Sequence, residues 1–206
     1  RFATLDLVRG EWRTYTQAIQ APGEYVAGDQ TNHTLFEQSA VNLEENSNRN
    51  PVPYVIPPGI YQEVYTGTLS TIRQNEQALQ LSVENLVDGD ARAVYKSTSF
   101  DFRYYQKLRM FIHAEKMYEY DNMEDGDLTV FLRFGSDLTD NYYEYEVPLK
   151  FTEWHTSSTD DFAIWPEENN IEIDFEELVE VKNNRNRSIG KNNVQSNRVY
   201  TETSGK

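Results

Sequence analysis

The three histidines, His33, His113 and His155, are the side chains best suited to acid–base chemistry or metal binding at neutral pH. They are far apart in the sequence, and no two of them have the short spacing of a metal-binding pair such as H-E-x-x-H. His113 and Glu115 lie two residues apart in "HAE", at the predicted end of a strand, so their side chains should share one face. This spacing favours a surface or hydrogen-bonded structural role over a zinc site or a catalytic site.

Two Asp-Gly-Asp motifs, at 88–90 and 125–127, raise the possibility of a calcium site, because Ca²⁺ takes several oxygen ligands from a bent backbone. "DNMEDG" even places Asp121, Asp125 and Gly126 at positions 1, 5 and 6 of an EF-hand loop. Met123 and Leu132, however, fall at positions 3 and 12, where the loop needs oxygen ligands, which excludes an EF-hand. A calcium site in a β-sandwich and a plain Asp-Gly turn both remain open, and the motif favours the turn.

The recognisable catalytic motifs are missing from the sequence. It contains no G-x-S-x-G, no P-loop and no dinucleotide-binding fingerprint. Paired carboxylates of the kind that glycoside hydrolases use follow from the acidic composition alone and identify no site. We therefore predict that the protein is not an enzyme, that it has no catalytic, cofactor-binding or metal-binding residue, and that it needs no cofactor.

A cluster of tyrosines supports one alternative function. Aromatic rings on a strand surface can stack on sugars, which would suit a carbohydrate-binding module of a secreted bacterial protein. At strand spacing, such rings more often pack in a core or at its rim. The residues concerned are Tyr104, Tyr105, Tyr142, Tyr143 and Tyr145.

The composition narrows the class of partner. The formal net charge of −15 argues against nucleic acid and against an anionic membrane surface, because both carry negative charge. The chain has no cysteine, so disulfides and Cys-ligated zinc are excluded. The sequence contains no run of 18 apolar residues, so it predicts no transmembrane helix.

Alternating apolar residues predict a mainly β protein. Half-buried strands are expected at "QALQLSVENL", with Leu79, Leu81 and Val83 on the buried face, and at "LTVFLRFG" and "NYYEYEVPL". Turns are predicted at Asp88-Gly89, followed by a returning strand, and at 124–127. One short helix is predicted from about Phe175 to Asn183, where Asp174 and Glu177 have the spacing of a capping box. Short strands with turns at roughly 8–12-residue spacing favour a jelly-roll-like β-sandwich with irregular loops.

Proline placement predicts how the chain is divided. Residues 51–60 contain four of the seven prolines, which lack the N–H that a central strand needs, and we interpret this segment as an extended connector. Residues 1–50 would be the closing strands of a preceding β-sandwich, and residues 61–185 the jelly-roll-like domain. Residues 186–206 are polar and are expected to form a mobile tail.

Several stretches together resemble the SprA/Sov family of giant outer-membrane proteins of Bacteroidetes. They are "RFATLDLVRGEWR", "YVIPPGI", "NEQALQL", "DGDARAVYK", "HAE", "NYYEYEVPL" and "IWPEENNI", and the resemblance runs from Arg1 to about Asn186. The family forms the translocon of the type 9 secretion system and serves gliding motility. The resemblance carries over no catalytic residue.

The resemblance implies a fragment with a supporting role. At 206 residues the chain cannot close the family's large β-barrel, so we expect one of its soluble inserts, facing the periplasm or the cell exterior. Its partners would be the remainder of the outer-membrane β-barrel, other secretion-system proteins and exported protein cargo, and not nucleic acid. The expected function is that of a non-enzymatic soluble domain of an outer-membrane protein-export translocon, which gives structural support and partner or cargo contacts.

Overall fold

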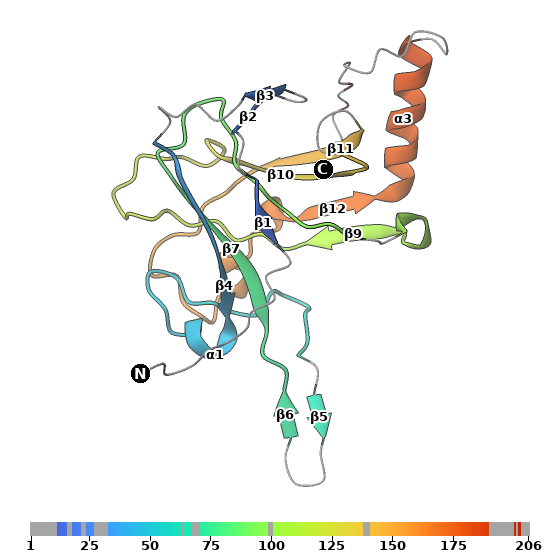
Figure 1. The fold of residues 1–206 in the computed structure, drawn as a ribbon. Helices are drawn as coiled ribbons and strands as arrows, with labels where there is room; N and C mark the ends of the chain where they lie inside the picture. Colours follow the sequence, from blue (N-terminus) through green and yellow to red (C-terminus); the bar gives the residue numbers. More distant parts are fainter. Residues whose placement is uncertain are drawn as a thin grey trace, which may run out of the picture.

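The computed structural model describes residues 12–15, 18–21, 24–26, 33–62, 64–66, 71–98, 101–137, 141–189, 200 and 202. Figure 1 shows the arrangement of their elements, with the helix α3 standing at one end and the β5–β6 hairpin projecting at the other. In chain order the elements are β1 (Arg13–Thr14), β2 (Ala18–Ala21), β3 (Glu24–Val26), β4 (Leu35–Asn42), α1 (Leu43–Asn46), β5 (Val64–Thr66), β6 (Thr71–Arg73), β7 (Gln77–Glu84), β8 (Val94–Tyr95), the 3-10 turn η1 (Phe102–Tyr104), β9 (Lys107–Met110), β10 (Thr129–Gly135), β11 (Tyr142–Pro148), α2 (Asp161–Ile164), the 3-10 turn η2 (Glu167–Asn169), β12 (Ile171–Asp174) and α3 (Phe175–Ile189).

Strand residues outnumber helical ones, which confirms the prediction of a mainly β protein. Within the described residues, the strands pair only in twos, all antiparallel: β1 with β8, β2 with β3, β4 with β7, β5 with β6, β9 with β12 and β10 with β11. A jelly roll needs larger sheets, stacked face to face. The described strands do not form such sheets, because each pair ends at an edge that no third described strand occupies.

Two hydrophobic cores lie among the described residues. The β10–β11 hairpin and the β9–β12 pair enclose the first core. Val147, Ile171 and Ile173 are buried at its centre, and Leu108, Val130, Tyr145 and Leu178 are among the side chains that pack around them. The alternating pattern of "NYYEYEVPL" predicts this arrangement, because Tyr145, Val147 and Leu149 fall on the face that turns inward. The ring of Phe175, at the start of α3, lies 5.5 Å from the ring of Phe102 and closes one side.

The helix α3 begins where the sequence predicts but continues further. The Asp174 side chain accepts a hydrogen bond from the Glu176 N–H, which satisfies an amide at the helix start. The helix then runs to Ile189 rather than ending near Asn183, so it takes in the first four residues of the predicted tail. Side-chain contacts support this polar last part: Asn184 donates to Glu202 across 18 residues, and Arg187 donates to Asn184. Most of the remaining tail lies outside the described residues.

The second core includes the proline-rich segment. Val52 and Tyr54 are buried there together with Ile164 and Trp165, and Val41, Leu43 and Ala78 pack around them. The prolines predict an extended backbone, in which successive side chains point to opposite sides. Val52 and Tyr54, two residues apart, therefore both point inward. The division into separate units stays a prediction, but two strand pairs, β1–β8 and β4–β7, join residues from both sides of 51–60.

The strand β7 forms where the sequence predicts it, but its pairing partner and its buried face differ from the prediction. Its partner is β4, and the predicted returning strand after the Gly89 turn pairs instead with β1, as β8. Leu79 and Leu81, expected on the buried face, are 40% and 46% exposed. The face of β7 that lies toward the core carries smaller or polar residues, since Ala78 packs against the core and Ser82 contacts the Met117 sulfur. Alternation shows which residues share a face, but not which face another element covers.

Burial of the proline-rich segment predicts a difference between two matched substitutions. Val52 is fully buried, so Val52→Ala should lower the free energy of unfolding by about 2 kcal/mol through lost burial and the cavity it leaves. Val87 is 56% exposed, so Val87→Ala should change it by less than about 0.5 kcal/mol. Urea denaturation of both variants measures the difference, and equal small effects would show that residues 51–55 do not pack in a core.

Candidate functional site

Both Asp-Gly-Asp motifs form turns. Gly89 and Gly126 have φ values of 78° and 92°, in the left-handed region that favours glycine. In the second turn, Asp127 accepts from the Glu124 N–H and Asp125 accepts from the Phe151 N–H. In the first turn, Asp90 pairs with Arg92 at 3.2 Å. These carboxylates act within the protein by fixing turns and neighbouring backbone, as an Asp-Gly turn requires.

The described residues contain no group of three or more His, Asp or Glu side chains placed to hold a metal ion. Among the histidines, His33 is exposed beside β4, and His155 takes a left-handed backbone conformation with φ of 64° while its N–H donates to Pro51 O. His113 alone lies in a polar network, and that network is the largest concentration of interacting charged groups around the second core.

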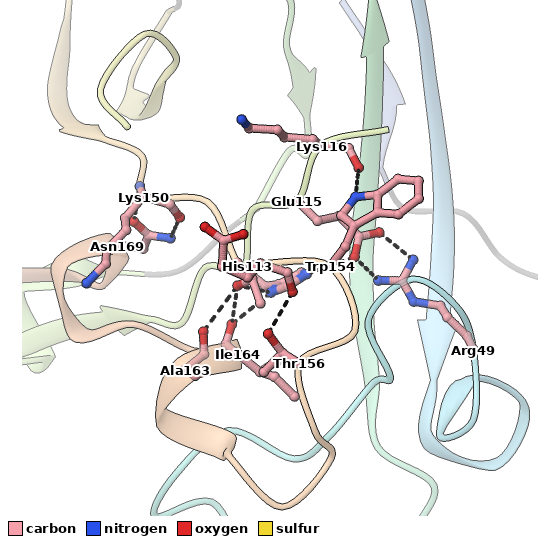
Figure 2. Close-up of polar contacts among 12 residues, drawn as sticks. Arg49, His113, Glu115, Lys116, Lys150, Trp154, Thr156, Ala163, Ile164 and Asn169 are labelled. Atoms are coloured by element: carbon pink, nitrogen blue, oxygen red, sulfur yellow. Dashed lines mark hydrogen bonds and ion pairs between the residues drawn. The ribbon is translucent and has the colours of Figure 1, made fainter. Parts of the chain in front are cut away.

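The centre of this network is a bidentate ion pair between Arg49 and Glu115. Figure 2 shows the Arg49 guanidinium directed at the Glu115 carboxylate, with Nη1 and Nη2 at 2.7 and 2.8 Å from the two oxygens. The two side chains are only 21% and 18% exposed, so water screens the pair weakly. The geometry is the parallel fork that gives arginine–carboxylate pairs their strength and direction.

His113 adds a second contact to Glu115, as the "HAE" spacing predicts. Its Nε2 lies 3.2 Å from Glu115 Oε2, and its Nδ1 lies 2.7 Å from the backbone oxygen of Ile164. Both ring nitrogens therefore face oxygen acceptors within the protein. The hydroxyl of Thr152 donates to the carbonyls of Ala163 and Ile164 beside the ring. The arrangement orients the imidazole as a cross-link between backbone segments.

The environment of Glu115 favours its charged form. Burial by itself would raise the pKa of this carboxyl group, but the hydrogen bonds from His113 and Arg49 and the positive charge of Arg49 outweigh burial, so the pKa lies below the ordinary glutamate value. A carboxylate held ionised in this way is suited to an ion pair. It is poorly suited to donating a proton as a general acid.

We call the residues Arg49, His113, Glu115 and Thr152 the clasp. With the Ala163 and Ile164 carbonyls that they contact, they join four segments. Arg49 follows α1, His113 and Glu115 follow β9, and Thr152 forms a parallel bridge with Glu115. Two indole N–H groups reinforce the same joints: Trp154 donates to Lys116 O and Trp165 donates to Val55 O. The clasp thus fastens the proline-rich segment and its neighbours to the part of the chain around 113–116 and 152–165.

A buried asparagine makes a similar joint near the first core. Asn169 is fully buried, and its side chain accepts from Lys150 N–H and donates to Lys150 O at 2.7 and 2.8 Å. The amide thereby imitates a pair of strand hydrogen bonds, as Figure 2 shows. Sequence reasoning identified neither Asn169 nor Arg49, because no local pattern connects either residue to its distant partner.

Comparison with known proteins identifies the family. The family model SprA_N, described as "Motility related/secretion protein", matches residues 1–206. The chain belongs to this family. The match confirms the SprA/Sov resemblance and indicates a protein related to motility and secretion. No curated protein matches the sequence.

The tyrosines of this SprA/Sov family chain do not share one exposed surface. Tyr145 packs against the first core, Tyr143 stacks on Phe134, and Tyr142 lies under the Arg133 guanidinium at 4.0 Å. Of the five tyrosines considered for a sugar-stacking platform, Tyr104 and Tyr105 are the exposed ones. A sugar-stacking platform built from all five, as the alternative function requires, is therefore not formed.

None of the helices described in this SprA/Sov chain has both the length and the apolar character to cross a bilayer.

The lowered pKa of Glu115 predicts how stability depends on pH. Because its pKa in the folded protein is below the value in the unfolded chain, the ion pair contributes stability above the unfolded value of about 4.5, and this contribution is lost as the pH falls through the folded value. Glu115→Gln should therefore be less stable than the unmodified chain at pH 7, and the difference should shrink as the pH falls below about 4.5. Urea unfolding between pH 3 and 7 measures this, with the exposed Glu153→Gln as the control. A constant gap across that range would contradict the assignment.

Loss of Arg49 should be more costly than loss of an ordinary surface arginine. Arg49→Ala leaves the half-buried Glu115 carboxylate without its main partner and should lower the free energy of unfolding by about 2–3 kcal/mol. Arg73→Ala, at an exposed position of β6, should cost less than about 0.5 kcal/mol. Arg49→Lys should recover only part of the loss, since an ammonium cannot form the fork. Full recovery by lysine would show that charge alone matters.

Proposed function

We propose that this chain is a non-enzymatic domain of an outer-membrane protein-export translocon, one that serves type 9 secretion and gliding motility by structural support and by contacts with partners or cargo. The observation that carries the proposal is the match of the motility and secretion family over the whole chain. The type 9 system, the translocon and the outer-membrane location follow the SprA/Sov resemblance and are part of the proposal.

The use of the polar side chains supports a non-enzymatic role. Arg49 and Glu115 neutralise each other, and His113 has both ring nitrogens engaged by protein oxygens. A catalytic acid or base needs a proton-transfer atom within reach of a substrate. These groups instead hold backbone segments together, which is the chemistry of a scaffold.

The open strand pairs also support this proposal. Two-stranded sheets are marginal by themselves and gain stability when more strands or another surface are added. The β-sandwich of jelly-roll type is accordingly proposed as the arrangement that these pairs complete within the full-length protein. The partners would be the membrane-embedded remainder of that protein, other secretion proteins and exported cargo.

The proposal predicts separate results for removal of the domain and for conservative change of its clasp. In a gliding member of the Bacteroidetes, deletion of residues 34–189 from the chromosomal gene should abolish export of secreted proteins and colony spreading. The His113→Gln variant should keep both, because glutamine can retain hydrogen bonds without supplying acid–base chemistry. The measurements are protein in the culture medium, colony spreading, and the amount of full-length protein in the outer membrane as the control.

Two outcomes would contradict the proposal. Normal export of secreted proteins after the deletion would contradict a role of this domain in secretion. Loss of export in His113→Gln, with the protein present at its normal level and normally folded, would indicate chemistry at the histidine. A glycan panel that changes tryptophan or tyrosine fluorescence would favour the carbohydrate-binding alternative.

A further inference from the structure

The paired strands β4 and β7 direct their apolar side chains outward. Leu79, Leu81 and Val83 stand opposite Ala40, Gln38 and Phe36, so the six residues share one face, which we call the outer face. Leu79 and Leu81 are 40% and 46% exposed, and Ala40 is exposed as well. The opposite face meets the second core through Val41 and Ala78. A strand pair normally buries its apolar face, but this ribbon leaves Leu79 and Leu81 partly exposed on its outer face.

The outer edge of β7 also has no backbone partner among the described residues. Leu43 N–H donates to Glu76 O, and Leu43 stands opposite Glu76 in the same register, so this is a hydrogen-bonded pair of the antiparallel ladder. Alternation along the ladder then turns the backbone groups of Leu79, Leu81 and Val83 away from β4. The outward N–H of Asn42 agrees with this parity, because it donates to the Asn46 side chain. Among the described residues, no backbone group bonds to the outer edge of β7.

The ribbon lacks two of the residue types that usually protect an exposed edge, and its charged residues, Glu37 and Glu84, lie on the face opposite the outer face. Natural proteins discourage pairing at open edges with lysine or proline, and neither occurs in β4 or β7. On the outer face, the Gln38 side chain of β4 donates to the Trp12 carbonyl, so Trp12 lies next to the β4 side of the ribbon. The edge of β7, with its two exposed leucines, is therefore the more open one.

The charge around the ribbon specifies what would bind there. Residues 34–46 and 74–88, which comprise both strands and their flanks, contain no lysine or arginine. They contain six carboxylates, so an added strand would lie in a negative field that attracts basic side chains. The six are Glu37, Glu44, Glu45, Glu76, Glu84 and Asp88.

We propose that the outer edge of β7 is a docking site for an extended segment of a partner protein that alternates apolar and basic residues. The segment would add as a strand beside β7, pair with the outward backbone groups of Leu79 and Leu81, and place its apolar side chains on the outer face. Its basic side chains would meet the surrounding carboxylates. This inference deepens the proposed function, on which it rests only for the idea that the domain contacts partners.

The test uses the 206-residue chain and three blocked nine-residue peptides. The first alternates lysine and valine, the second replaces every lysine with glutamate, and the third replaces every valine with glycine. The lysine–valine peptide should bind with a dissociation constant below about 1 mM, because backbone hydrogen bonds, apolar contacts and opposite charge all favour it. The other two should bind at least about tenfold more weakly, because one has the wrong charge and the other has no apolar face.

Matched variants locate the binding. Leu79→Lys/Leu81→Lys should weaken binding of the lysine–valine peptide at least about tenfold. Val64→Lys/Val179→Lys makes the same charge change at exposed valines outside β4 and β7 and should have little effect. All of these positions are exposed, and circular dichroism checks that both variants remain folded. Hydrogen exchange should slow at the Leu79 and Leu81 amides of the unmodified chain when the peptide is added.

Several results would overturn the proposal. They are equal binding of the lysine–glycine peptide, equal weakening in both double variants, and Leu79 and Leu81 amides that are already protected in the free chain. If these amides exchange slowly in the free chain and the chain is a dimer, the edge of β7 pairs with a second copy. If they exchange slowly in a monomer, the edge is covered by another part of the same chain. Binding of neutral lipid vesicles that Leu79→Lys/Leu81→Lys abolishes would assign the face to a membrane. None of these results affects export in cells, so the proposed function fails or stands by its own test.

Discussion

The bidentate ion pair between Arg49 and Glu115 joins parts of the chain that are 66 residues apart in sequence. Around it, the imidazole of His113 and the hydroxyl of Thr152 reach the carbonyls that end α2. The second core, with Val52 and Trp165 at its centre, lies beside these contacts. Because the described strands form only two-stranded sheets, the proline-rich segment and the β4–β7 ribbon depend on contacts outside the sheets, namely this polar joint and the second core.

The same joint also fixes the charge state of its carboxylate. A half-buried ion pair needs both partners charged and hydrogen-bonded, and the pKa of Glu115 is lowered accordingly. The side chains that could do chemistry are thereby committed to one another. At β7, two partly exposed leucines lie beside a strand edge that no other described strand occupies. Family membership itself indicates a protein related to motility and secretion.

Local patterns predicted the elements well and their partners poorly. The alternation of Tyr145 and Val147 placed β11 and its inward face, and the Asp174 cap placed the start of α3, because both signals act within a few residues. The partner of β7 was missed: the Gly89 turn suggests a local hairpin, but β4, far upstream, has the better-matched ladder of eight residue pairs. The prolines at 51–58 correctly indicate an extended backbone and say nothing about burial. Arg49 was not predicted at all, since an isolated arginine shows no sign of a partner 66 residues away.

A double-mutant cycle on Arg49→Ala and Glu115→Ala tests most directly whether the clasp holds the fold together. Each single variant and the double variant would be unfolded in urea at pH 7, and the free energies compared. If the two side chains stabilise the fold through each other, the double variant should lose about 1–3 kcal/mol less than the sum of the single losses. Losses that add to within about 0.5 kcal/mol would show that the pair does not couple, and the account of the clasp as the central joint would be wrong.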